Sequence, residues 1–498
     1  MKLDLDYNNR QIIPRLLPYK NKSIFLTDKK IEDFEPEESD IQQYMKLKID
    51  WDQNKSMSFA IQLVATAETL NLVDDDYYLE ALSFIKYHNN LITDNQLLKY
   101  YLDPINNNDD DNCYSINLNC RELIREIKGK LLLYINDPVL WTDLAYYYVI
   151  SRNKIKAERC ISIALALNNY NPHIIRSAVR YFVYCQEPEK ALYVLRKSPN
   201  LIINPTLLSA EISVAEAFHL KTVNVKKGIA LLRENRHSHN LLAELNASIA
   251  TIELNYGNIK KGKKLVNNAL IDPNENTLAQ IQYLAQKNNF VFFPQKYEVP
   301  CRYEADSLNY FYKNSYREVI VETRKWFDFH PFSSRPAILN SFVNATIFNN
   351  HEEAISIIDE SLKLSSGNSL LLNNKAFSLA KIGKIDQAKE CIKEIRTSKT
   401  NDFDNIDNNT LKATLGLIEY RSKNPEEGRK LYQEAVDFFE KNGYYDLQAR
   451  ALYFWAEEEE NFNVVESKKI LSKASDIALK YNVQETKALL EKKEQLKE

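Results

Sequence analysis

The chain has 498 residues, of which 44% are hydrophobic and 27% are charged, and these values exclude an intrinsically disordered protein. The formal net charge of −3 gives no overall bias toward nucleic acid or acidic membrane surfaces. The N-terminal stretch MKLDLDYNNRQIIPRLL has acidic and amide residues where a secretory signal needs an apolar run, and no segment reaches about 18 uninterrupted apolar residues. We therefore expect a cytoplasmic protein that does not enter a membrane.

The segments before residue 121 give the weakest signals. Residues 1–55, which include the acidic stretch FEPEESD, match no pattern that predicts an element. Residues 56–104 are expected to form a helical pair that is an imperfect repeat. The Asn- and Asp-rich residues 105–120 are expected to form a flexible, solvated loop.

The rest of the chain predicts helices almost throughout. Nine glycines in 498 residues argue against a protein of sheets and loops. Apolar residues recur at three- and four-residue spacing in long segments, which short Asn, Asp, Gly or Pro turns interrupt. Short turns between helices of similar length favour antiparallel pairs, so we expect an all-α fold.

Small residues recur in this helical pattern at intervals of 34 residues. The pairs at this spacing are Ala157 and Ala191, Gly228 and Gly262, and Ala354 and Ala388. Two helices cross closely only where side chains are small, so each pair marks the same contact point in successive helix pairs. A helix pair cannot bury its faces alone, which predicts a stacked array.

A period of 34 residues with one helix pair per period resembles the tetratricopeptide repeat (TPR). The best match to the repeat signature is formed by Trp141, Leu144, Ala145, Tyr148, Ala157, Ile161 and Ala164. The resemblance implies an α–α superhelix, a TPR solenoid of about eight or more helix pairs, with the first helix of each pair lining a concave groove. One bulky residue, Phe342, occupies a slot that normally needs a small side chain.

The repeats are expected in two arrays, at residues 121–288 and 304–498. The segment NNFVFFPQKYEVPCRY between them holds aromatic and β-branched residues and two prolines, so it cannot be regular helix. We interpret residues 289–303 as an extended connector.

The sequence gives no sign of catalysis. The glycines are too scattered for GxxxxGK or GxGxxG, and neither GxSxG nor HExxH occurs. The six cysteines show no CxxC spacing and are interpreted as reduced core thiols. The four glutamates at 457–460 are interpreted as a solvated helix end. We therefore expect a protein that is not an enzyme and has no cofactor and no metal site.

The first candidate for partner binding is a basic stripe in the first array. His173, Arg176 and Arg180 follow one another at spacings of three and four residues, and Tyr146 projects from the preceding first helix. The repeat register directs this stripe toward the concave groove. Because arginine binds carboxylates with two hydrogen bonds, the stripe would suit an acidic peptide or a C-terminal carboxylate.

The second candidate is a set of amides in the second array. Asn340 and Asn374 occupy the same slot in successive repeats, and Asn344 and Asn373 are nearby. In some superhelical repeat proteins such a ladder holds the backbone of an extended peptide. Two rungs at ~0.5–1.5 kcal/mol each are too weak alone, so pockets around Phe377 or Phe342 would have to contribute.

Three functions remain open from the sequence. The leading one is a non-catalytic scaffold or adaptor that binds a protein or peptide partner in its groove. The second is an intracellular regulator or sensor that responds to a peptide. The third is a subunit of a nucleic-acid-handling complex, although Lys226, Lys227 and the stretch KKGKK at 260–264 lie on second helices, which face outward. We expect no direct binding of nucleic acid.

Overall fold

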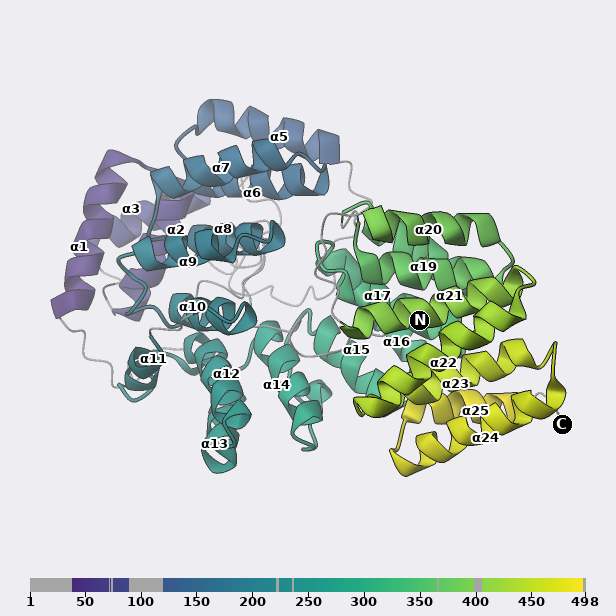
Figure 1. Ribbon diagram of the computed structural model, residues 1–498. Helices are drawn as coiled ribbons and strands as arrows, with labels where there is room; N and C mark the ends of the chain where they lie inside the picture. The colour runs from purple at the N-terminus through teal and green to yellow at the C-terminus, as the bar shows by residue number, and fades with distance from the viewer. Residues whose placement is uncertain are drawn as a thin grey trace. The chain divides into compact units, whose positions relative to one another are not determined.

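A computed structural model describes residues 38–70, 72, 75–88, 120–220, 224–234, 237–364, 367–397 and 405–495. These residues form twenty-four α-helices, one 3₁₀ turn and one π turn, and they contain no β-strand. The expected all-α repeat fold is confirmed (Figure 1). The loop expected at 105–120 lies outside the described residues except for Cys120, which begins a helix.

The contacts divide the chain after Ala305 into two compact units, which we call the N-terminal and the C-terminal unit. The described helices of the N-terminal unit are α1 (Glu38–Gln53), α2 (Met57–Thr69), α3 (Asp76–Tyr87), α5 (Cys120–Leu133), α6 (Pro138–Ile150), α7 (Lys154–Leu167), α8 (Pro172–Tyr184), α9 (Pro188–Lys197), α10 (Pro205–Ala217), α11 (Val225–Leu231), α12 (His239–Asn255), α13 (Ile259–Ala269) and α14 (Glu275–Lys287).

Between α14 and the next α-helix, the segment after residue 287 contains only the 3₁₀ turn Pro294–Lys296. Helix α15 (Tyr303–Tyr312) spans the boundary between the units. The C-terminal unit then continues with α16 (Tyr316–Phe329), α17 (Arg335–Phe342), the π turn η5 (Val343–Ile347), α18 (His351–Leu362), α19 (Ser369–Lys381), α20 (Ile385–Thr397), α21 (Asn405–Arg421), α22 (Pro425–Lys441), α23 (Tyr445–Glu459), α24 (Val464–Lys480) and α25 (Gln484–Gln495).

Helix pairs follow one another along both units. Successive helices such as α6 and α7, α12 and α13, α19 and α20, and α23 and α24 pack together as pairs. Within each pair the first helix is the more buried. In α8, ten of thirteen residues are buried, whereas in its partner α9 only Ala191, Leu192 and Leu195 are. We therefore call the first helices inner helices and the second helices outer helices.

Asparagine and aspartate start many of these helices. The side chain of Asn171 accepts a hydrogen bond from the His173 backbone N–H, and Asn204 and Asn274 begin α10 and α14 in the same way. Proline follows the cap directly in α8 and α10, where its missing N–H costs nothing. Much of the asparagine in this chain therefore serves to begin helices.

The turn inside seven of the pairs places one residue in the left-handed region, two positions before the second helix. Residues of this kind are Arg152, Gln186, Gly257, Asn314, Asn349, Gly383 and Lys423, with φ between 55° and 80°. Only glycine adopts this conformation without a steric cost, yet most of these turns use other residues. Packing of the two helices therefore holds the turn.

The small residues found by the period of 34 lie at the contact between helices. Ala157, Ala191, Ala354 and Ala388 are fully buried on the outer helices. A Cβ added to Gly262 would lie 2.5 Å from Leu254 of the inner helix α12. The period thus marks the positions where the helices approach most closely.

Two features of the fold were not expected from the sequence. Helix α1 lies in the segment for which no element was predicted, and its Trp51 is fully buried against Phe84 of α3, with ring centroids 5.2 Å apart. The bulky Phe342 is also fully buried, and α17 passes into the π turn directly after it. A wide residue in a narrow slot is thus accommodated beside a local widening of the helix.

Candidate functional site

Four inner helices of the N-terminal unit, α8, α10, α12 and α14, carry buried polar side chains, which we call the polar seam. Its members are Arg176 and Ser177 on α8, Ser209, Glu211 and Ser213 on α10, Glu244, Ser248 and Thr251 on α12, and Gln280 on α14. All are buried except Thr251, which is half-buried. Burial of so many polar groups is costly unless they are hydrogen-bonded, so the seam requires a physical explanation.

Hydroxyl groups and one amide connect α10, α12 and α14 within the seam. The Ser248 hydroxyl lies 2.7 Å from that of Ser209 and 3.1 Å from that of Ser213, and it donates to the Glu244 carbonyl oxygen. Farther along, the Gln280 side-chain amide donates to the Thr251 hydroxyl at 2.8 Å. Three inner helices are therefore joined by polar contacts.

A buried ion pair connects α8 with α12. The Arg176 guanidinium donates through one nitrogen to both carboxylate oxygens of Glu244, at 2.8 and 3.1 Å. The amide of Asn274, which caps α14, donates to the same carboxylate at 2.9 Å. Nearby, the buried Glu211 of α10 accepts two hydrogen bonds from Arg196 at 2.8 and 3.2 Å.

Several buried polar atoms of this region have no hydrogen-bond partner among the described residues. They are Nε and one terminal nitrogen of Arg176, the Ser177 hydroxyl, one carboxylate oxygen of Glu211 and the Gln280 side-chain oxygen. Each such atom costs about 1–3 kcal/mol. They include both donors and acceptors, and a ligand that offers both kinds of group would satisfy them.

Arg176 of the predicted basic stripe belongs to this polar seam, but its positive charge is balanced by a partner. Arg176 is paired with Glu244, so it is not the free cation that an acidic peptide would need. His173 is buried, and burial together with the nearby Arg176 charge lowers the pKa of its imidazole to about 3. Arg180 is half-buried. Tyr146 of α6 is buried beside Tyr147, with ring centroids 5.1 Å apart.

Sequence reasoning missed Glu244 because it lies 68 residues from Arg176. No local pattern connects residues at that distance. Only the stacking of α8, α10 and α12 brings the two charges together.

Two members of the predicted asparagine ladder in the C-terminal unit, Asn340 and Asn344, make internal contacts. The Asn340 amide donates to the Thr323 hydroxyl at 2.9 Å and to the Ile320 carbonyl oxygen, while its oxygen accepts from Asn344 at 2.8 Å. Asn373 and Asn374 are buried on α19. Asn340 therefore connects α17 with α16, and we do not include it in the candidate site.

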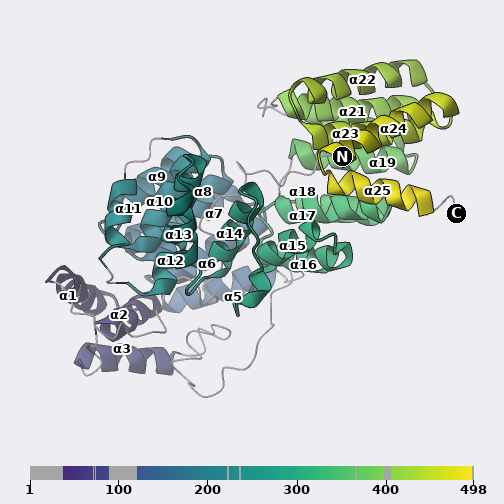
Figure 2. The ribbon, with the colours of Figure 1, turned by 90° about the horizontal axis from the view of Figure 1, so that it is seen from below.

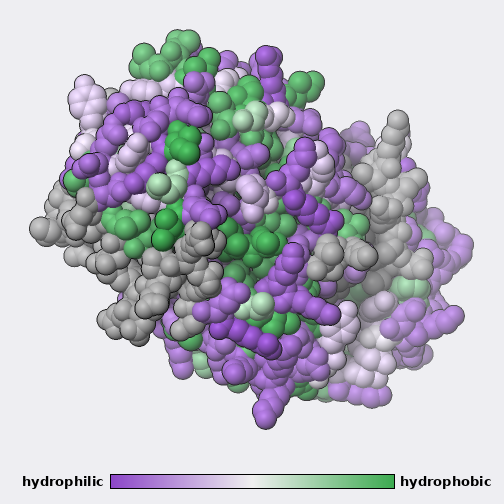
Figure 3. Space-filling view, turned by 90° about the vertical axis from the view of Figure 1, so that its left-hand side faces the viewer, coloured by the Kyte–Doolittle hydropathy of each residue, from purple (hydrophilic) through white to green (hydrophobic). Residues whose placement is uncertain are grey.

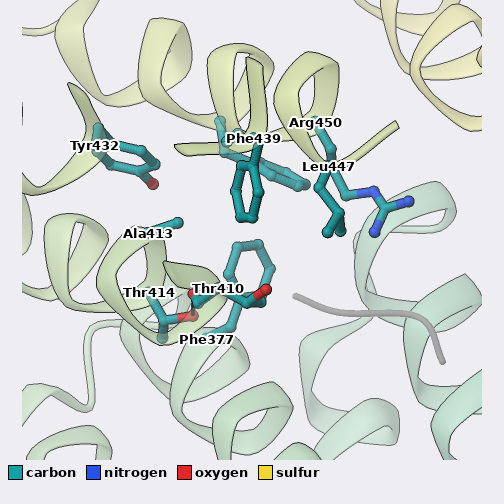
Figure 4. A pocket seen from close by; sticks show the side chains of 10 residues that line it. Phe377, Thr410, Ala413, Thr414, Tyr432, Phe439, Leu447 and Arg450 are labelled. Carbon is teal, nitrogen blue, oxygen red and sulfur yellow. Dashed lines mark hydrogen bonds between the residues drawn. The ribbon is translucent and has the colours of Figure 1, made fainter. Parts of the chain in front are cut away.

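Phe377 borders a cavity of about 30 Å³ between the inner helices α19, α21 and α23 and the outer helix α22 (Figure 4). This volume has room for one or two water molecules. The Phe377 ring lies 4.9 Å from that of Phe454, and the Arg450 guanidinium lies 4.9 Å from the centre of the Phe342 ring. Figure 4 shows the Arg450 guanidinium directed away from the aromatic rings that line the cavity. The inner helices of this unit are thus packed together by large side chains.

The glutamates at 457–460 do not all form the solvated helix end that was expected. Glu458 and Glu459 are almost completely buried. Glu458 accepts hydrogen bonds from Arg421 and Lys381, and Glu459 accepts two from Arg429 at 2.7 and 2.9 Å. These cations lie 30 to 77 residues away in the sequence, so a local reading of the run could not detect them.

Other classes of site receive no support within the described ranges. No helix there is both long and apolar enough to cross a membrane, and no three His, Cys, Asp or Glu side chains gather closely enough to hold a metal ion.

The five described cysteines are free thiols, but only Cys160 and Cys391 are buried, so the expectation of core thiols holds for two of the five. The side of the N-terminal unit seen in Figure 3 is mostly hydrophilic with small hydrophobic patches.

No family model matches the sequence, and no curated protein matches it. Among solved structures, the chain is similar to a human IFIT1 dimer with PPP-AAAA, at 12% identity over 93% of this chain and 96% of that one, with a TM-score of 0.34. It is similar to yeast Tom70 at 14% identity over 84% of this chain and 96% of that one, with a TM-score of 0.33. A tetratricopeptide repeat protein from Parabacteroides merdae matches at 13% identity over 71% of this chain and 99% of that one, with a TM-score of 0.25.

At these identities and TM-scores the likeness supports no conclusion about function. The helix pairs, their period and the small residues at their contacts define the class: an all-α helical repeat fold that resembles the tetratricopeptide repeat.

Proposed function

We propose that this protein is a non-catalytic cytoplasmic scaffold whose N-terminal unit binds an extended peptide segment of a protein partner along the polar seam. The proposal rests on one observation. Helices α8, α10 and α14 carry buried polar atoms that have no hydrogen-bond partner among the described residues. An array that served only to stack helices would be more stable with apolar side chains at these positions.

The chemistry of the seam favours a peptide over a nucleic acid. A peptide backbone offers a donor and an acceptor at each residue, which matches the mixture of free donors and acceptors. Phosphates need uncompensated cations, whereas Arg176 is paired with Glu244 and Arg196 with Glu211. Lys226, Lys227 and the lysines of the stretch at 260–264 are exposed on the outer helices α11 and α13.

The number of free atoms limits the affinity. Five new hydrogen bonds at about 0.5–1.5 kcal/mol each give about 2.5–7.5 kcal/mol, which is below the ~8 kcal/mol of micromolar binding. Apolar contacts of the peptide side chains supply the rest, so we expect micromolar affinity or weaker. Because each helix pair contacts mainly its neighbours, small rotations at successive pairs open the inner face to admit the peptide.

A peptide selection on the intact protein tests this function. A display library of random 12-residue peptides is selected on the full-length chain, and the dissociation constant of a selected peptide is then measured for wild type, Ser177→Ala and Ser162→Ala. Ser177→Ala removes a hydroxyl that has no described partner, whereas Ser162 is exposed on the outer helix α7 and serves as the control. We expect about 2- to 10-fold weaker binding for Ser177→Ala only.

Two results would contradict the proposal. One is equal affinity of the selected peptides for Ser177→Ala and wild type, with the same equality for Gln280→Leu. The other is a library that yields no peptide while a 20-nucleotide single-stranded RNA binds, which would support the nucleic-acid alternative. A change of solenoid curvature on peptide binding, measured by small-angle scattering, would support the regulator alternative.

A further inference from the structure

The last described helix of the chain bridges two parts of the C-terminal unit that are far apart in the sequence. The Lys492 ammonium group of α25 donates to the Ile347 carbonyl oxygen of η5 at 2.8 Å, across 145 residues. On the other side, Lys493 pairs with Glu460 at 2.7 Å, just beyond the end of α23. Helix α25 packs against α23, α24 and η5. Figure 2 draws it as the yellow helix that leads to the C-terminus.

One narrow stripe of α25 makes these contacts. Thr486 and Leu489 are buried, and Leu490 packs with Val483 against α23 and α24. Most of the other α25 side chains are charged, and Glu485 faces the Tyr316 hydroxyl, whose pKa is raised by burial and by this negative charge. A helix held by one apolar stripe has the form of a ligand helix lying in a groove.

The receiving surface has a feature that favours a cation. In η5 the Phe348 backbone N–H donates to the Val343 carbonyl oxygen five residues earlier, and the Asn350 backbone N–H reaches the Asn344 carbonyl oxygen. The carbonyl of Ile347 lies at the C-terminal end of this turn, where the helix leaves carbonyl groups without helical partners and carries partial negative charge. A lysine in the last turn of a docked helix complements this end.

We propose that the surface formed by η5 and the α23–α24 pair is a docking site for an amphipathic helix with one apolar stripe and lysines in its last turn. In this structure α25 occupies the site. A helix of a partner protein with the same pattern takes its place when α25 leaves. This site lies in the C-terminal unit, so it does not depend on the peptide function proposed for the polar seam.

The test uses the full-length chain and one defined probe, a fluorescent peptide with the sequence of residues 482–495. The variant Leu489→Asp with Lys492→Glu releases α25, because it places a carboxylate in the buried stripe and another beside the Ile347 carbonyl oxygen. Fluorescence anisotropy should show that the peptide binds this variant at least about tenfold more tightly than wild type. The same peptide with Leu489→Asp is the matched control and should not bind.

Failure to bind the variant, or equal binding to variant and wild type, would overturn the proposal. If the double variant loses the helical circular dichroism of wild type, the single variant Lys492→Ala replaces it. That change removes the bond to Ile347 alone, and the expected gain in peptide affinity is about 2- to 5-fold. No gain in this folded variant would equally overturn the proposal.

Discussion

Arg176 of α8 and Glu244 of α12 form a buried ion pair that reaches past the intervening pair α10–α11, with side chains 4% and 5% exposed. The pair connects helices that are not neighbours in the array. It therefore helps to fix how tightly the N-terminal unit curves. It also buries two charged groups between helices that apolar side chains alone could hold together.

Removing one member of this pair should destabilise the protein strongly. Glu244→Leu leaves the Arg176 charge buried without its partner, and we expect the free energy of unfolding to fall by about 3–5 kcal/mol. The double variant Arg176→Met, Glu244→Leu should recover most of this loss, because an apolar pair of similar size has no charge to desolvate. Urea unfolding followed by circular dichroism measures both. Equal losses in the single and double variants would show that the ion pair is not the source of the effect.

Acid should destabilise the N-terminal unit through His173. The pKa of His173 is about 3 in the folded protein, against about 6.5 in an unfolded chain. Between these values the unfolded state binds the proton and the folded state does not. His173 therefore costs no stability above pH 6.5, and the free energy of unfolding falls by up to about 1.4 kcal/mol per unit as the pH drops toward 3.

The variant His173→Gln isolates this contribution. Its free energy of unfolding should depend less steeply on pH than that of wild type between pH 6 and 4. Burial lowers the pKa of His351 to about 4, which acts in the same sense, and raises that of Asp137 to about 6, which acts in the opposite sense. Both groups remain in the variant and cancel from the comparison. Identical pH profiles of wild type and variant would contradict the prediction.

Replacing Gly383 should destabilise the protein for a conformational reason alone. Its φ is +80° and a Cβ at this position would meet no atom within 4 Å, so only backbone strain opposes alanine. We expect Gly383→Ala to lower the free energy of unfolding by about 1–2 kcal/mol. Gly129 also has open space around its Cβ position but lies inside α5, so Gly129→Ala should stabilise the protein by about 0.5–1 kcal/mol. Thermal unfolding of the two variants should shift in opposite directions.

Replacing Gly428 should destabilise the protein because neighbouring atoms leave no space for a side chain. An added Cβ would lie 2.5 Å from the Tyr420 ring and 3.1 Å from the Gly416 carbonyl oxygen. The Tyr420 ring cannot move aside easily, since its hydroxyl donates to Glu459 and accepts from Trp455. We expect Gly428→Ala to cost about 1–3 kcal/mol of unfolding free energy. A loss no larger than a few tenths would mean that the helices of this pair can separate.

The sequence predicted the fold better than the site. The fold depends on contacts between residues that are close in the sequence, whereas the site depends on contacts between residues that are far apart in it. Ala157 and Ala191 or Ala354 and Ala388 report contacts within one helix pair, and such contacts repeat along the chain. The contacts of Arg176 with Glu244, of Asn340 with Thr323 and of Glu459 with Arg429 join residues that lie 17 to 68 positions apart, and each contact occurs once. No period reveals an interaction that does not recur.

The sequence by itself determined the all-α architecture, the helix pairs and the small residues at their contacts, because helix periodicity and close packing act over a few turns and repeat. The tertiary structure alone decided that Arg176 is neutralised by Glu244, that Asn340 is used for an internal contact, that Glu458 and Glu459 are buried and that α25 docks on η5. These outcomes depend on how successive pairs stack, which brings together side chains that no local rule connects. The electrostatics of the inner face follows from that stacking.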